Sequence, residues 1–134
     1  MFSHGLSLEC FEELIWKLRE KKVTWGNYLF KQGDQANEIC FIVSGTAEVV
    51  ISTKGQETII DEVGPGSSFG GYSVINGEQH TMSLKACYDI TVLTLEGSVL
   101  DELRESFSDL DHFMMEYESL IERTGMPYCD YKVY

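Results

Sequence analysis

Positive charge is scarce in this sequence. Its 134 residues include 10 Lys and Arg side chains against 22 Asp and Glu, which gives a formal net charge of −12. A nucleic-acid-binding surface needs a cluster of basic side chains, and an anionic membrane surface attracts basic segments. We therefore expect neither nucleic acid nor a membrane surface as the partner of this chain.

Long apolar runs are also missing. The apolar stretches are short, and none approaches the roughly 20 residues that a membrane-spanning helix needs, so we expect no direct membrane insertion. The first 30 residues carry Glu9, Glu12, Glu13 and Glu20, a composition that does not fit a signal peptide.

The cysteines lack the spacing of a metal or redox site. Cys10, Cys40, Cys87 and Cys129 form no C-x-x-C pair, and no histidine lies near any of them in the sequence. Closely spaced ligands are the signature of structural zinc sites. The pattern instead indicates unpaired thiols in a reducing compartment, and we expect a cytoplasmic location without a metal or cofactor.

Helical periodicity appears at both ends of the chain. Ser7 is a candidate N-cap for an amphipathic helix over 7–21, and apolar residues at helical spacing form one face of it. Residues 97–124 predict two further helices, with Ser98 and Ser108 as candidate N-caps. Residues 125–134 follow as a tail that begins with a Gly-Met-Pro sequence.

The region between the helices, residues 22–96, predicts short strands separated by glycine-containing turns. Lys54-Gly55-Gln56 lies between two strand-like segments and indicates a hairpin. Regular short strands with frequent turns are typical of a barrel or a double-sheet jelly roll. We therefore predict a single α+β domain over 1–134, an antiparallel β-roll with an N-terminal helix and C-terminal helices.

The run LFKQGDQANEICFIVSGTAEVVI, residues 29–51, carries a family resemblance. Its Gly33-Asp34 turn, its Gly45 and the later Gly64-Pro65-Gly66 and Phe69-Gly70 are similar to the cyclic nucleotide-binding domain family, over about residues 7–123. The resemblance implies a β-roll that acts as a regulatory part of a larger host, such as an ion channel, an exchanger or a kinase regulatory subunit.

The resemblance also implies that residues 69–83, FGGYSVINGEQHTMS, are the phosphate-binding cassette. In the family, backbone N–H groups and an Arg hold the cyclic phosphate, and a Glu binds the ribose hydroxyl. Here the Glu position is Gly71 and the Arg position is His80. The candidate ligand-binding residues are Phe69, Gly70, Gly71, Tyr72, Ser73, His80, Thr81 and Met82.

These substitutions leave several functions open. The first is a regulatory domain without the usual cAMP or cGMP contacts, in which the tail 128–134 could fill the pocket, as a C-terminal segment does in some potassium channels. The alternative is an atypical cAMP or cGMP sensor that uses backbone amides and His80 for the phosphate. The acidic helices could contact a basic partner, although such a face is more often solvated.

An enzyme is the least supported class. Of His4, His80 and His112, only His80 lies in the predicted strand region, and no nucleophile–base pair is evident. We therefore expect no catalytic residues and no metal site.

Overall fold

The computed structural model describes residues 7–112 and 115, and the predicted tail and most of the last predicted helix lie outside this part. Within it, the strands form two antiparallel sheets of four strands each, in the orders β1-β8-β3-β6 and β2-β7-β4-β5. The elements, in chain order, are α1 (Leu8–Lys17), β1 (Arg19–Val23), β2 (Tyr28–Phe30), β3 (Glu38–Ser44), β4 (Ala47–Thr53), β5 (Gln56–Val63), β6 (Ser68–Phe69), α2 (Gly71–Asn76), β7 (Ser83–Ala86), β8 (Ile90–Glu96) and α3 (Gly97–Ser106). This arrangement confirms the predicted α+β β-roll.

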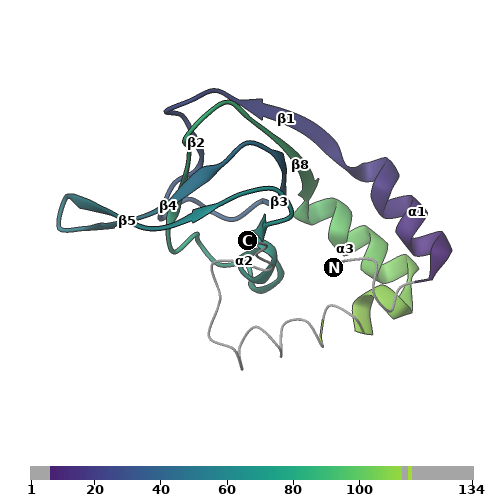
Figure 1. The fold of residues 1–134 in the computed structure, drawn as a ribbon. Coiled ribbons are helices and arrows are strands. Elements are labelled where there is room, and N and C mark those ends of the chain that lie inside the picture. Colours follow the sequence, from purple (N-terminus) through teal and green to yellow (C-terminus); the bar gives the residue numbers. More distant parts are fainter. Residues whose placement is uncertain (1–6, 113–114, 116–134) are drawn as a thin grey trace.

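Two apolar clusters lie on opposite faces of the first sheet. Successive side chains of a strand point to opposite faces, so Cys40 and Ile42 of β3 enter the cluster inside the roll. Ile39 of β3 and Leu95 of β8 point to the other face and join a cluster with residues of α1 and α3. Figure 1 shows α1 and α3 side by side at one end of the roll.

The N-terminal helix is shorter than predicted. Ser7 is its N-cap, and the Ser7 Oγ accepts a hydrogen bond from the Cys10 N–H at 3.2 Å, as the sequence predicts. The helix ends at Lys17, however, and residues 19–21 belong to strand β1, which pairs with β8. The apolar face of the helix ends at Leu18, so a further helical turn would bury no apolar side chain. As strand β1, the same residues instead form backbone hydrogen bonds with β8.

The caps predicted for the C-terminal helices are wrong. Helix α3 begins at Gly97 with Glu96 as its N-cap residue, and Ser98 lies inside the helix. Helical structure resumes at Ser108 itself, after Phe107, so Ser108 is a helical residue rather than a cap. In neither place does the candidate serine directly precede the first helical residue, so the capping preference does not decide the boundary.

The predicted hairpin between β4 and β5 is confirmed. Lys54 and Gly55 occupy its turn with φ angles of 52° and 80°, and positive φ at both central residues is the requirement of a type I′ turn. The hairpin projects away from the helices in Figure 1. No helix in the described part of the chain is both long and apolar enough to cross a membrane.

Candidate functional site

The cassette begins where the chain leaves the roll. Strand β6 pairs with β3, which places Phe69 opposite Cys40, and the Phe69 side chain is fully buried inside the roll. Gly70 follows as the N-cap residue of α2 with a left-handed backbone, and Gly77 ends the helix in the same conformation. The sequence thus produces the short helix that the family resemblance implies.

Gly70 holds the start of the cassette against β3. Its φ is 91°, and a Cβ atom added there would lie 2.8 Å from the backbone oxygen of Glu38. A side chain would therefore be strained by its backbone conformation and would also collide with β3. Glycine at this position allows the cassette to approach the strand closely.

The return from the cassette is fixed by the turn between β2 and β3. The His80 N–H donates to the Asp34 carbonyl at 2.8 Å, and the Gly33 N–H donates to the His80 carbonyl at 2.8 Å. Gln35 and Gln79 form an isolated antiparallel bridge beside them. The backbone of His80 is therefore bound on both sides to a segment some 45 residues earlier in the sequence.

The His80 side chain packs inside the protein. Its ring stacks on Phe30 with a centroid distance of 3.8 Å and an interplanar angle of 12°, and its exposed fraction is only 7%. Burial lowers the pKa of His80 below its ordinary value, and the carboxylates of Asp34 and Glu38 oppose that effect without cancelling it. The imidazole is therefore mostly neutral at pH 7.

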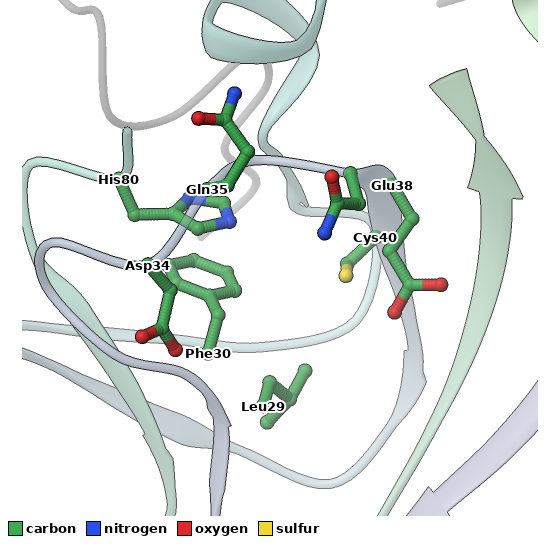
Figure 2. Close-up of a pocket in the computed structure, with 8 residues that line it drawn as sticks. Leu29, Phe30, Asp34, Gln35, Glu38, Cys40 and His80 are labelled. Carbon is green, nitrogen blue, oxygen red and sulfur yellow. The ribbon is translucent and has the colours of Figure 1, made fainter. Parts of the chain in front are cut away.

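A cavity of about 520 Å³ opens beside this ring. We call it the His80 hollow. Its lining consists of Leu29, Phe30, Asp34, Gln35, Asn37, Glu38, Cys40 and His80. Figure 2 shows His80, Phe30 and Asp34 on one side of the space, Glu38 and Cys40 on the other, and Leu29 below.

The electrostatic character of the His80 hollow is acidic. Its lining contains two carboxylates, Asp34 and Glu38, and neither Lys nor Arg among the described residues. Glu38 pairs with Lys21 at 3.3 Å, but this ion pair is partly exposed. Such a pair contributes little to stability because water solvates both charges.

The other predicted ligand residues are only partly brought together. Gly70 lies close to His80, since its added Cβ would stand 3.6 Å from the His80 Cε1. Met82 lies in the core of the roll, Ser73 is buried and Thr81 is exposed. Gly71 and Tyr72 form the first turn of α2, and the side chain of Tyr72 is outside the described part of the structure.

Sequence reasoning missed the acidic partners of His80. The sequence pattern places Asp34 in a turn after Gly33, and it gives no sign that Glu38 lies near His80. Both face His80 because the cassette returns across the β2–β3 turn, a pairing that no local sequence pattern indicates. A resemblance-based alignment locates the Arg position but not the charges opposite it.

The profile of the cyclic nucleotide-binding domain family matches residues 20–107. The chain belongs to this family. The matched segment contains strands β2 to β8, all of β1 except Arg19, and the complete cassette.

The curated relatives include channels. The chain is 25% identical over 121 residues to the potassium channel GORK of Arabidopsis thaliana, which covers 86% of this chain and 15% of that protein. It is 24% identical over 113 residues to the cyclic nucleotide-gated potassium channel mll3241 of Mesorhizobium japonicum, which covers 84% of this chain and 30% of that protein. The chain thus spans less than a third of the length of either channel.

Solved structures agree on the fold of this domain. The N-terminal domain of a transcriptional regulator from Streptomyces coelicolor A3(2) superposes with a TM-score of 0.80 at 20% identity, covering 92% of this chain and 87% of that one. At this level of identity the likeness concerns the fold alone.

Proposed function

We propose that this chain is a regulatory, non-enzymatic domain of a larger potassium-channel-type host, placed in the cytoplasm, and that it does not bind cAMP or cGMP through the usual contacts. Membership of the family and the relatedness to channels support the first part. The burial of His80 and its lowered pKa support the second part. The partner of the domain is then the rest of its host protein.

The observation that carries the proposal is the environment of His80. In this family an Arg supplies the cation for the phosphate, but the imidazole at that position is buried, stacked on Phe30 and lowered in pKa. Asp34 and Glu38 line the same hollow, and although Lys21 pairs with Glu38 at 3.3 Å, the lining contains no Lys or Arg that could attract an anionic ligand. A neutral histidine can still donate one hydrogen bond, but it does not replace a bidentate and permanently charged guanidinium.

The energetic consequence can be bounded. Loss of one charge-assisted hydrogen bond costs about 1.5–3 kcal/mol, which corresponds to about one to two decades in affinity. Loss of the ribose-binding carboxylate at Gly71 adds a similar amount if its contribution is similar. A site that would otherwise bind at micromolar ligand would then need millimolar ligand.

The test is calorimetric titration with cAMP and with cGMP, up to millimolar ligand, at pH 6 and pH 8. We expect no saturable binding at micromolar ligand at either pH, while the far-UV circular dichroism stays that of a folded protein. Micromolar binding that weakens as the pH rises would contradict the proposal. It would instead support the atypical sensor, with a protonated His80 as the cation for the phosphate.

A further inference from the structure

Helix α1 has apolar side chains on two opposite sides. Cys10 and Leu14 are buried in the cluster that also contains residues of α3, whereas Leu8, Ile15 and Trp16 are 71%, 50% and 83% exposed. Residues seven and eight positions apart lie along one side of a helix, so the three exposed side chains form a single line, which we call the α1 stripe. In Figure 1 α1 lies at the rim of the molecule, with α3 on its inner side.

The α1 stripe is not needed to hold the helix on the domain. One apolar side is enough for a helix that covers a core, and Cys10 and Leu14 already supply it. Single exposed apolar residues are common, but an apolar line with a polar border has the composition of a protein–protein interface. Tryptophan is among the residues that contribute most to binding at such interfaces, and Trp16 is the most exposed residue of the stripe.

Carboxylates accompany the α1 stripe. Glu12 lies at its centre, four residues from both Leu8 and Trp16, and Glu9 and Glu13 follow along one border. All three glutamates are exposed, and none of them forms an ion pair with another residue between 7 and 112. The exposed side of the neighbouring helix α3 adds three further carboxylates, those of Asp101, Glu102 and Glu105.

This charge decides which partner fits the stripe. In a two-fold contact between two copies of the domain, Leu8 of one copy would pack on Trp16 of the other, and Glu12 would then meet its own counterpart at the centre. Like charges at that position repel. An anionic membrane surface is repelled by the same carboxylates. A basic helix with an apolar side has complementary charge as well as a complementary surface.

We propose that the α1 stripe is the docking site for a basic amphipathic helix of the host protein. The apolar side of that helix packs on Leu8, Ile15 and Trp16, and its Lys or Arg side chains pair with the glutamates. This inference rests on the proposed function, because the host supplies the helix. The curated channel relatives leave ample length for one, since the chain spans only 15% and 30% of them.

The experiment uses the two tryptophans of the chain as separate reporters. Trp25 is 74% exposed, close to the value for Trp16, but it lies in the turn at the far end of β1 from α1. Trp25→Phe therefore leaves only the tryptophan of the stripe, and Trp16→Phe leaves only the matched control. The probe is a Leu/Lys peptide of about 18 residues, or five helical turns, with leucine at helical spacing and no aromatic residue.

We expect the peptide to move the fluorescence of Trp16 to shorter wavelength in a saturable way, because docking removes this ring from water. The emission of Trp25 should not move. A peptide of the same composition without helical periodicity, and a Leu/Glu peptide with the same spacing, should leave both tryptophans unchanged. Equal shifts of the two tryptophans, or no shift of Trp16, would overturn the inference.

Single variants in the Trp25→Phe background test the contacts. Ile15→Ala removes part of the stripe, and we expect peptide binding to weaken about tenfold. Glu12→Gln removes one exposed charge, and we expect a loss of about two- to fivefold. Ile59→Ala, at an exposed residue of β5, and Glu78→Gln, in the turn after α2, are the matched controls. Equal affinity in all four variants would place the peptide elsewhere and overturn the inference.

The other occupants are tested with the same proteins. A concentration-dependent dimer that Ile15→Ala abolishes, measured by sedimentation, would assign the stripe to a second copy of the domain. A shift of Trp16 with vesicles that contain phosphatidylserine, and none with the peptide, would assign it to a membrane. Either result would overturn the inference. Calorimetric titration with cAMP tests the proposed function separately, because micromolar cAMP binding contradicts that function whatever the peptide does, whereas failure of the peptide alone removes only the docking site.

Discussion

The interior of the roll and the His80 hollow are built by neighbouring residues but have opposite chemistry. Phe69 and Met82, near the two ends of the cassette, are buried in the apolar cluster between the sheets. His80, two residues before Met82, lies in a space with two carboxylates. The residues that give the domain its shape are thus distinct from those that decide which ligand charge it accepts, and one set can change without the other.

The largest effect should come from the interior of the roll. Phe69→Ala removes a fully buried ring, and we expect the free energy of unfolding to fall by about 3–5 kcal/mol. Urea denaturation followed by circular dichroism measures it. Ile59→Ala, at a residue of β5 that is 58% exposed, is the control and should change stability by no more than about 0.5 kcal/mol. Similar effects of the two variants would contradict the assignment of Phe69 to the core.

A smaller effect should follow from changing only the residues that would contact a cyclic nucleotide. The double variant Gly71→Glu/His80→Arg restores the family's ribose carboxylate and phosphate guanidinium, and we expect cAMP or cGMP affinity to rise about 100-fold or more. Calorimetric titration measures the change.

The control for this gain is Gly71→Glu/His80→Gln, which lacks the cation. If it binds cyclic nucleotide as tightly as the Arg-containing variant, the missing charge at position 80 is not what limits binding. Both variants replace a buried ring that stacks on Phe30, so unfolding curves are needed to check that each keeps its fold.

The smallest effect concerns pH. Because the pKa of His80 is lowered in the folded state, the unfolded chain binds a proton more readily. The contribution of neutral His80 to the free energy of unfolding is therefore complete above pH 6.5, and it declines as the pH falls toward the folded-state pKa. Each unit of depression is equivalent to about 1.4 kcal/mol.

The measurement is the free energy of unfolding at pH 7.5 and at pH 5.5, for the unaltered protein and for His80→Gln. We expect the unaltered protein to lose more stability over this range, because Gln cannot be protonated. Asp34, Glu38 and Lys21, the charged groups around the ring, are retained in both proteins. An identical pH dependence would show that His80 is not held neutral.

Much of the roll could be predicted from the sequence. Strands β2 to β5 and β8 follow apolar patterns bounded by glycine turns, and the turn at Lys54-Gly55 has the residues that a type I′ hairpin requires. Strand β1 was missed because its sequence, REKKV, is charged and is set by pairing with β8 rather than by an apolar face. Strand β6 is only two residues long and depends wholly on β3.

The candidate site was less predictable for the same reason. Gly71 and His80 could be placed from the cassette pattern, which concerns residues close together in the chain. The stack on Phe30 and the charges of Asp34 and Glu38 arise from tertiary contacts between distant segments. No spacing rule in one sequence contains that information.

The segment 33–38 also connects the cassette to helix α3 through backbone hydrogen bonds. At one end it is hydrogen-bonded to His80, and at the other the Asn37 carbonyl accepts from the Gly97 N–H at 2.7 Å, at the first residue of α3. A Cβ atom on Gly97 would lie only 2.9 Å from a methyl group of Val74 in α2, so the two helices have little clearance. A ligand that widened the hollow would therefore pull on the start of α3 through a few backbone bonds, and occupancy of the site would become a displacement of the helix.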